Sequence, residues 1–223
     1  MTPQWVRLFN HALACLDTIP ATGAPMPDWT FGGGTVLMLR YNHRNSHDVD
    51  IFLPDPQWLP ILDPERNDAV ADLAADSVKG PTFLKLVFPE GEVDFIATLP
   101  RTSRPYEIRR IEGRDVAVET PTEIIAKKLY YRGSWLRARD VFDFAVVFHH
   151  ESEALWQARH TWAKNVTAIH RQLEKIATFY DDDAAHLDLR PAGEPFRKTA
   201  WSLMNTFIDR QMREMTREYE PDR

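Results

Sequence analysis

The 223-residue sequence lacks several features that would each indicate a class of protein. Cys15 is its only cysteine, so an intramolecular disulfide and a zinc site made of several cysteines are excluded, which favours a reducing cytoplasm. Apolar runs of the about 20 residues that a membrane-spanning helix needs are missing. The first residues also do not resemble a secretory signal peptide. We therefore expect a cytoplasmic protein that does not contact a membrane.

An excess of positive charge is missing as well. The formal net charge of −6 disfavours a protein that coats nucleic acid, because such binding depends on a broad basic surface that neutralises phosphates. Basic residues are concentrated in the stretch 101–139, which holds ten Lys and Arg residues against five Asp and Glu residues. The charge distribution therefore permits a local basic rim on an acidic protein.

What the sequence does contain is a glycine turn followed by two acids. Gly33 and Gly34 precede a short helical pattern, after which Asp48 and Asp50 stand one residue apart in an apolar, β-branched segment. Alternate side chains of a strand share a face, so the two carboxylates converge. Adjacent anions that both stay ionised normally hold a cation, and glycine N–H groups that lead into a helix bind phosphate. The pattern indicates a divalent metal beside a phosphate.

A third acid, Asp94, lies in another expected strand. The segment 91–98 follows the apolar run 83–88 across a proline turn, which predicts a β-hairpin. If this strand is the neighbour of the strand that carries Asp48 and Asp50, the three carboxylates share one face of the sheet. Such a set can hold two Mg²⁺ ions about 4 Å apart. The three acids therefore indicate metal-dependent chemistry on a nucleotide.

A basic helix is expected after Pro121. Lys128 and Arg132 fall on one face of this helix, where they would neutralise phosphate charge or simply face solvent. The next helix carries Asp140 and Asp143, which would orient a base, a cation or a donor hydroxyl, or form weak ion pairs with arginines of their own helix. The residue pattern alone leaves these alternatives open.

Three blocks of these residues resemble the AbiEii/AbiGii-type nucleotidyltransferase toxins, a branch of the DNA polymerase β-like nucleotidyltransferase superfamily. The first block joins 33–35 to the run 44–52, the second is 121–132, and the third is the Arg-Asp-x-x-Asp motif at 139–143. Together they cover the segment from Phe31 to Phe148. Their order and spacing make the resemblance more specific than a lone Gly-Gly or Asp-x-Asp.

The resemblance implies an enzyme that transfers a nucleoside monophosphate from an NTP to an acceptor and releases pyrophosphate. It implies that Mg²⁺, or alternatively Mn²⁺, is bound by three acids, Asp48, Asp50 and Asp94. These acids would act in catalysis together with two residues of the later blocks, Lys128 and Asp143. Nucleotide binding is assigned to a further set: Gly33, Gly34, Thr35, Arg44, Ser46, Arg132 and Asp140.

Some of these assignments keep alternatives. Lys127 competes with Lys128, and only the family register, in which the lysine precedes a leucine, favours Lys128. Arg44 would also serve as the partner of a structural acid. Because a threonine stands where many superfamily members have the serine of Gly-Ser, the hydroxyl that meets the phosphate would be that of Thr35 or Ser46.

The resemblance also implies a biological setting. Members of the family act as type IV toxin–antitoxin or phage-defence toxins, which implies an RNA acceptor, often tRNA, and a cognate antitoxin protein as partners. Two other functions stay open: a catalytically silent nucleotide- or RNA-binding module of the same fold, and a nucleotidyltransferase that acts on a small molecule. The sequence does not identify the preferred NTP.

Strands and short helices precede long helices along the chain, which predicts an α+β fold. The resemblance specifies a polymerase β-like mixed sheet with flanking helices, followed by a C-terminal helical bundle. We expect a catalytic domain at 1–120 and, at 121–223, a helical domain that contributes to the active-site cleft. Helices are expected at about 121–132, 135–149, 152–180 and 195–219. Large apolar residues of the last part should form its core: Trp156, Trp162, Leu173, Ile176, Phe179, Trp201, Leu203, Met204, Phe207 and Ile208.

Overall fold

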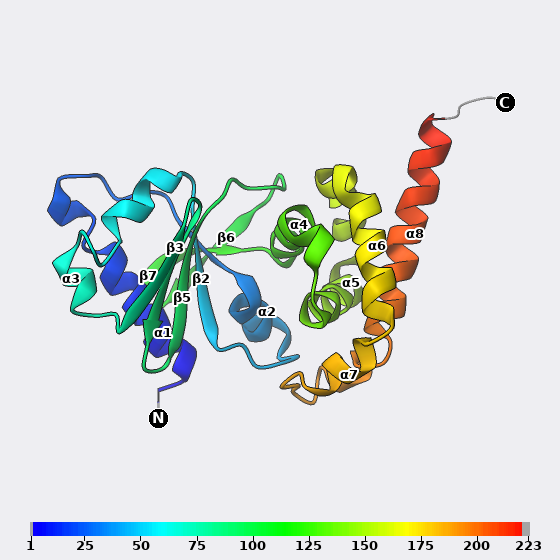
Figure 1. Cartoon of the computed structure of the whole chain (residues 1–223), viewed down its shortest axis with the longest axis horizontal. Helices are drawn as coiled ribbons and strands as arrows, with labels where there is room; N and C mark the ends of the chain where they lie inside the picture. The colour runs from blue at the N-terminus through cyan, green and yellow to red at the C-terminus, as the bar shows by residue number, and fades with distance from the viewer. Residues whose placement is uncertain (1, 220–223) are drawn as a thin grey trace. The chain divides into compact units, whose positions relative to one another are not determined.

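The computed structural model describes residues 2–219, which form two compact units (Figure 1). The first unit is made of Met1–Leu39, Ser46–Pro100 and Tyr106–Thr120. The second unit contains the remaining C-terminal part, Pro121–Arg223, and two short segments from earlier in the chain, Arg40–Asn45 and Arg101–Pro105. Within residues 2–219 no helix is both long and apolar enough to cross a membrane.

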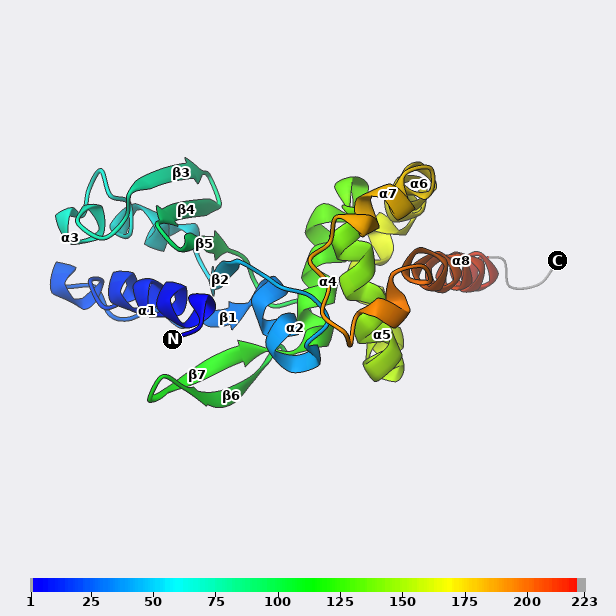
Figure 2. The same cartoon turned by 90° about the horizontal axis from the view of Figure 1, so that it is seen from below.

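A seven-stranded mixed sheet organises the first unit, with strand order β3-β4-β5-β2-β1-β7-β6. The neighbours β2 and β5 run parallel, as do β1 and β7, whereas the other pairs are antiparallel. Figure 2 shows β3 and β6 at the two edges of the sheet. The strands are β1 (Thr30–Gly32), β2 (Asp48–Leu53), β3 (Asp76–Gly80), β4 (Phe83–Phe88), β5 (Gly91–Ala97), β6 (Tyr106–Ile111) and β7 (Arg114–Glu119).

The core of the first unit lies on one face of this sheet. Along β2 the side chains of Val49, Ile51 and Leu53 are fully buried, while the intervening residues are half-buried on the other face. Helix α1 (Gln4–Leu16) packs against β2 and β5 through buried residues such as Leu8. Burial of a large apolar side chain stabilises the fold by about 1.5–3 kcal/mol. The shorter helical elements are η1 (Pro20–Thr22), α2 (Gly33–Tyr41), η2 (Pro56–Ile61) and α3 (Asp68–Ala71).

The second unit is a helical bundle. Helix α5 packs against α4 and α8, and α6 also lies beside α8 (Figure 1). Its core includes Trp162, whose indole N–H donates a 3.0 Å hydrogen bond to the buried Gln211 side chain. The elements are α4 (Pro121–Arg132), η3 (Gly133–Trp135), α5 (Ala138–Ala158), η4 (Arg159–Asn165), α6 (Val166–Ala177), α7 (Tyr180–Ala185), η5 (Glu194–Phe196) and α8 (Ala200–Tyr219).

The mixed sheet with flanking helices and the C-terminal helices confirm the expected fold class. One helix over 152–180 was the wrong expectation, because the chain leaves the α-helix after Ala158 and re-enters it at Val166. Helix α5 is also kinked at Glu151, where φ is −135° and ψ is 39°. The Glu151 carboxylate accepts a 2.7 Å hydrogen bond from the Tyr41 hydroxyl, a contact that helical periodicity does not reveal.

Most residues expected in the helical core are buried there, with one clear exception. Phe179 is 42% exposed, because it lies at the N-terminal boundary of α7, a helix that the sequence did not predict. Trp156, Trp201 and Leu203 are half-buried rather than buried. The aromatic residues of this unit thus form its core only in part.

Candidate functional site

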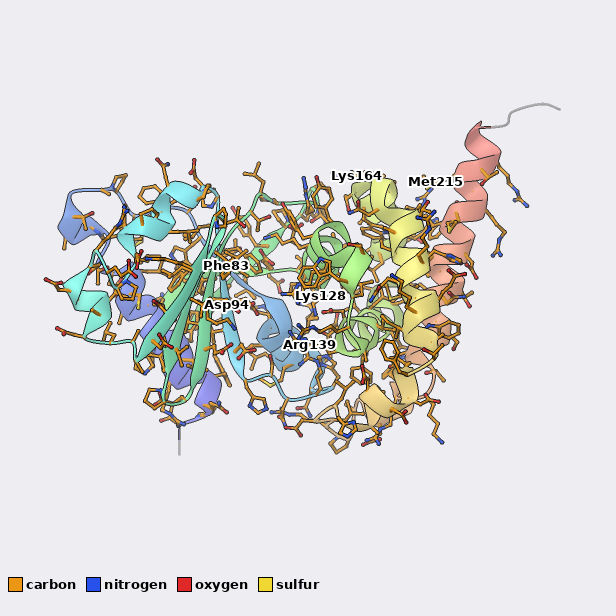
Figure 3. The ribbon with its side chains drawn as sticks, viewed as in Figure 1. Phe83, Asp94, Lys128, Arg139, Lys164 and Met215 are labelled. Carbon is orange, nitrogen blue, oxygen red and sulfur yellow. The ribbon has the colours of Figure 1, made fainter. Side chains whose placement is uncertain are left out.

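The three acids singled out in the sequence lie on two neighbouring strands of the first unit. Asp48 and Asp50 belong to β2 and Asp94, which Figure 3 labels, belongs to β5; the parallel register pairs Asp50 with Asp94. Since adjacent strands are about 4.8 Å apart, the sheet brings these carboxylates close together on one face. The opposite face carries buried apolar residues such as Val93 and packs in the core.

Burial and mutual repulsion shift the pKa of one of these three carboxylates. Burial, followed by the negative charge of Asp50, raises the pKa of Asp94 to about 7, with smaller contributions from Asp48 and Glu92. Lys85 on β4 opposes the increase: its ammonium lies 3.7 Å from the Asp94 carboxylate and also hydrogen-bonds to Glu92. Negative charge therefore exceeds positive charge on this part of the sheet.

These side chains fit a divalent cation in their chemistry. Carboxylate oxygens are the ligands that Mg²⁺ and Mn²⁺ prefer, and a cation would relieve the repulsion that raises the pKa of Asp94. In residues 2–219, however, no three or more His, Cys, Asp or Glu side chains are gathered as a set of metal ligands. Since Mg²⁺ can be held by one or two carboxylates together with substrate phosphates, the metal site stays a prediction.

The glycine turn lies directly beside one of these acids. Gly33 begins α2 with a left-handed φ of 71°, and a Cβ atom at this position would overlap the Asp50 carboxylate. Only glycine combines this backbone conformation with so close a contact. Gly34 follows as the second residue of the helix, so the N-terminal N–H groups of α2 start next to the β2 acids.

The two hydroxyls expected near phosphate differ in their surroundings. Thr35 is fully buried, and its hydroxyl donates a hydrogen bond to the main-chain carbonyl of Asp48. It thereby ties α2 to the start of β2. Ser46 is half-buried just before β2, and its backbone N–H lies 3.3 Å from the Met38 sulfur. Of the two, Thr35 has a structural contact that already accounts for its hydroxyl.

A buried ionic network occupies the second unit, centred on Asp143 of α5. The Arg44 guanidinium donates two hydrogen bonds to the Asp143 carboxylate, at 2.7 and 2.8 Å. Lys128 of α4 donates to the same carboxylate at 2.6 Å and to Asp140 at 2.8 Å. His43 Nε2 lies 2.9 Å from Asp143, which has no exposed surface. Residues from two separate stretches of sequence, 43–44 and 128, thus converge on the Asp143 side chain.

The network fixes the ionisation of its acids. Burial opposes ionisation of Asp143, but Arg44 and Lys128 outweigh it and hold the pKa of Asp143 well below its usual range. The pKa of Asp140 is also lowered despite burial, chiefly by Lys128. Asp140 additionally accepts the Arg137 backbone N–H at 3.1 Å and so caps α5. Both acids are therefore structural ion partners, and not members of weak ion pairs within their own helix.

The remaining basic candidates are placed as follows. Lys127 is buried with its ammonium 3.8 Å from Glu123, whereas Lys128 belongs to the Asp143 network, and the choice of Lys128 stays a prediction. Arg132 is half-buried, with its guanidinium 5.3 Å from the Trp135 ring. Arg44 takes the structural alternative open to it, a buried ion pair with an acid.

Sequence reasoning missed His43. Its ring is buried and stacks on Phe142 at 5.7 Å, while Nε2 contacts Asp143. Nothing in the pattern marked this histidine, because it precedes β2 in a loop without periodicity and its partners lie about one hundred residues later. Its position beside Arg44, which the resemblance did indicate, was the single available signal.

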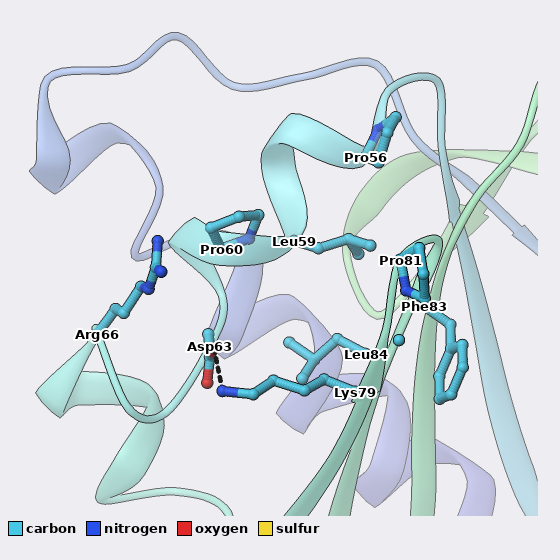
Figure 4. A pocket seen from close by; sticks show the side chains of 10 residues that line it. Pro56, Leu59, Pro60, Asp63, Arg66, Lys79, Pro81, Phe83 and Leu84 are labelled. Atoms are coloured by element: carbon cyan, nitrogen blue, oxygen red, sulfur yellow. Dashed lines mark hydrogen bonds and ion pairs between the residues drawn. The ribbon is translucent and has the colours of Figure 1, made fainter.

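A pocket of about 320 Å³ lies elsewhere in the first unit, between η2 and the β3–β4 hairpin (Figure 4). Its walls include Leu59 and Phe83, and an ion pair of 2.8 Å joins Lys79 to the largely buried Asp63. The residues that line it include none of the expected site residues. The pocket is therefore separate from the acids of β2 and β5.

Comparisons with known proteins agree with the fold of the chain. A family model described as the nucleotidyl transferase AbiEii toxin of a type IV toxin–antitoxin system matches residues 21–222. No curated protein sequence matches the chain. The crystal structure of ANT(2″)-Ia in complex with adenylyl-2″-tobramycin superposes with a TM-score of 0.52 at 15% identity, over 73% of this chain and 98% of that one.

A solution structure of the antibiotic-resistance factor ANT(2″)-Ia gives a similar result. Its TM-score is 0.51 at 15% identity, over 78% of this chain and 100% of that one. At such low identity the likeness shows a shared fold.

Proposed function

The chain belongs to the AbiEii family of nucleotidyl transferase toxins and is a nucleotidyltransferase, and from this premise we propose that it transfers a nucleoside monophosphate from an NTP to RNA. The observation that carries the proposal is the register that pairs Asp50 with Asp94 beside the glycine turn of α2. It combines acidic side chains with helix N-terminal N–H groups, the two features that a metal-bound triphosphate needs.

The reaction exchanges one bond to the α-phosphorus of the NTP for another. The acceptor hydroxyl oxygen forms the new bond, and the bond to the β-phosphate bridging oxygen breaks, so pyrophosphate leaves with that electron pair. Asp94 of β5, whose pKa is raised to about 7, accepts the hydroxyl proton. The N–H groups of Gly33 and Gly34 hold phosphate oxygens at the start of α2. The family motif, and not the placement of the two units, assigns Lys128 the neutralisation of negative charge that develops on the phosphates.

Mg²⁺, or Mn²⁺ in its place, would be held by Asp48, Asp50 and Asp94, and when bound it would supply charge neutralisation and activate the attacking oxygen. Through this cation, Asp48 and Asp50 would hold the triphosphate at β2. Asp143 holds Lys128 in place by its 2.6 Å hydrogen bond, as a positioning residue.

The biological part of the proposal rests on the family. A type IV toxin implies a cognate antitoxin protein as partner. We propose that the acceptor is RNA, often tRNA, and that the enzyme acts in the cytoplasm, where both reside. The net charge of −6 does not oppose this, because the basic residues are concentrated in the stretch 101–139.

The experiment incubates the protein with each α-labelled NTP, Mg²⁺ and total RNA, and follows label in the RNA fraction. Label should enter RNA with the wild type and should be lost with Asp48→Asn, which removes one acid of β2. A protein that binds nucleotide yet transfers no label to any fraction would contradict the proposal and identify a silent binding module.

A second candidate acceptor is a small molecule. It is favoured by the fold shared with ANT(2″)-Ia, whose crystal structure holds adenylyl-2″-tobramycin. Label that enters a low-molecular-weight fraction, and not RNA, would select this candidate. The same assay therefore distinguishes the two acceptors.

A further inference from the structure

Three segments of the second unit contain no acidic residue. The segments 101–105, 124–139 and 159–173 together hold ten Lys and Arg residues and no Asp or Glu, in a chain whose net charge is −6. These segments meet in space, because the Tyr130 ring of α4 contacts both of the others. Acids from outside these segments pair with Lys127, Lys128 and Arg159, so the charge that attracts an anionic partner lies at the cations around the Tyr130 ring.

Aromatic rings accompany the cations at this place. The Arg101 guanidinium lies 3.8 Å from the Tyr130 ring centroid and the Lys164 ammonium lies 4.2 Å from it. Lys164 also donates a 2.6 Å hydrogen bond to the Tyr130 hydroxyl. The Tyr131 ring is next to that of Tyr130, with 4.8 Å between centroids. The cations are thus held against aromatic faces at the surface (Figure 3 labels Lys164).

Two of the rings at the end of α4 are strongly exposed. Tyr131 is 47% exposed and Trp135 is 52% exposed, one helical turn apart in the sequence. The Arg132 guanidinium lies 5.3 Å from the Trp135 ring. Large exposed aromatic side chains next to cations are typical of surfaces that bind single-stranded nucleic acid, where bases stack on the rings and phosphates meet the cations.

We propose that this aromatic–basic patch binds a single-stranded segment of RNA, an inference that rests on the proposed RNA acceptor and identifies where that acceptor is held. The patch consists of Arg101, Tyr130, Tyr131, Arg132, Trp135 and Lys164. Stacking requires unpaired bases, whose faces a duplex hides, so the patch selects single strands. An acidic protein would meet the cations but would leave Tyr131 and Trp135 without base faces to stack on.

The test measures binding of a fluorescein-labelled oligouridylate to the full chain by anisotropy. The double variant Tyr131→Ala/Trp135→Ala should bind about tenfold or more weakly, because it removes two stacking platforms. Tyr106→Ala is the matched control, since Tyr106 is 48% exposed on β6 of the other unit, and it should bind like the wild type. Equal affinity of the double variant and the wild type would overturn the proposal.

The charge contribution has its own readout. Lys164→Glu should reduce the slope of log affinity against log salt by about 0.7 for each phosphate that the variant no longer neutralises, whereas Arg110→Glu on β6 should not change it. Binding of an RNA duplex of equal length as tightly as the single strand would overturn the stacking mechanism. Circular dichroism of each variant confirms that the fold is retained.

The label-transfer assay separates this inference from the proposed function. If wild-type protein labels RNA while the patch variants bind the oligouridylate normally, the proposed binding role of the patch is wrong and the proposed transfer to RNA is supported. If the oligouridylate binds through the patch but label never enters RNA, the binding role of the patch is supported and the proposal that RNA is the acceptor is wrong.

Discussion

At Gly33 a single hydrogen atom in place of a side chain allows two features of the site to meet. The backbone adopts φ of 71°, and the Asp50 carboxylate occupies the space that a Cβ atom would need. Gly33 therefore permits the turn and also leaves room for the Asp50 carboxylate. These two roles can be separated, because Gly113 has a similar φ of 77° but open space around it.

Gly33→Ala should abolish most activity, whereas Gly113→Ala should not. Both variants carry the left-handed backbone cost of about 1–2 kcal/mol in unfolding free energy, but only Gly33→Ala displaces Asp50, which should lower the transfer rate about a hundredfold. Urea denaturation and the label-transfer assay measure the two effects. Equal activity of the two variants would show that the Asp50 position is unimportant.

The ionisation of a single residue, Asp143, makes the stability of the fold depend on pH. Because the pKa of Asp143 is lowered in the folded protein, ionisation of this residue stabilises the fold above the unfolded pKa of about 3.9. This stabilisation is lost as the pH falls through the folded pKa. Below pH about 4 the unfolding free energy of the wild type should therefore decrease steeply.

Asp143→Asn tests this dependence. At neutral pH it should lower the unfolding free energy by about 3–5 kcal/mol, because Arg44 and Lys128 lose a buried counter-ion. The decrease of the unfolding free energy below pH about 4 should become less steep. Asp115→Asn removes the same charge from an exposed side chain paired with Arg110, and it should show the same decrease of the unfolding free energy at acidic pH as the wild type. If the unfolding free energy of Asp143→Asn decreased at acidic pH as steeply as that of the wild type, the stabilising role of ionised Asp143 would be contradicted.

At the scale of the element, the sequence predicts some parts well because local physics decides them. The alternation along β2 placed Asp48 and Asp50 on one face, and α4 begins at Pro121 and ends at Arg132 as expected. Edge strand β3 was missed, since its residues are mostly exposed and do not alternate. The break after Ala158 was also missed, because tertiary packing of the buried Trp162 determines it.

The Asp143 network shows the same limit. The resemblance indicated Arg44, Lys128 and Asp143 one by one, but their convergence depends on tertiary contacts across about one hundred residues. His43 gave no periodic signal at all. The roles of these residues in catalysis stay predictions, whereas their mutual contacts are structural facts.

Helix α4 anchors the loop 101–105 through one buried acid. The Glu123 carboxylate accepts hydrogen bonds from the backbone N–H groups of Arg101 and Thr102, each at 2.8 Å, and from the Thr102 hydroxyl at 2.6 Å. Glu123→Ala should lower the unfolding free energy by about 3 kcal/mol, since buried donors lose their acceptor. Thermal and urea unfolding measure the loss.

A matched change on the surface gives the control. Glu174 on α6 has a side chain that is 63% exposed, so Glu174→Ala should change stability by less than about 0.5 kcal/mol. Comparable losses in the two variants would contradict an anchoring role of Glu123.

At the scale of the whole molecule, the helical part of the second unit, from Pro121 on, depends on the two segments of that unit that come earlier in the sequence. His43 and Arg44 satisfy Asp143, and Arg101 and Thr102 satisfy Glu123, although all four lie before Pro121. A fragment of residues 121–223 therefore contains two buried acids without most of their partners. It should retain helical far-UV circular dichroism but lose cooperative unfolding. A fragment that unfolds cooperatively at the melting temperature of the full chain would contradict this dependence.

The family, the fold class and the nucleotidyltransferase activity expected from the sequence are confirmed by the match over residues 21–222 and by the shared fold. Their signal was the order of three motif blocks, which needs no tertiary information. The acceptor and the metal depend on side-chain positions that a sequence does not specify, so both remain proposals. The central claim is that the acids of β2 and β5 drive attack on the α-phosphorus of an NTP.

The most direct test compares α-labelled with γ-labelled NTP as donors to RNA, with wild-type protein and with Asp50→Asn, in the presence of Mg²⁺. The account predicts that RNA acquires label from the α-labelled NTP alone, and that Asp50→Asn reduces this transfer at least about a hundredfold. Label that reaches RNA from the γ-phosphate, or undiminished transfer by Asp50→Asn, would contradict it.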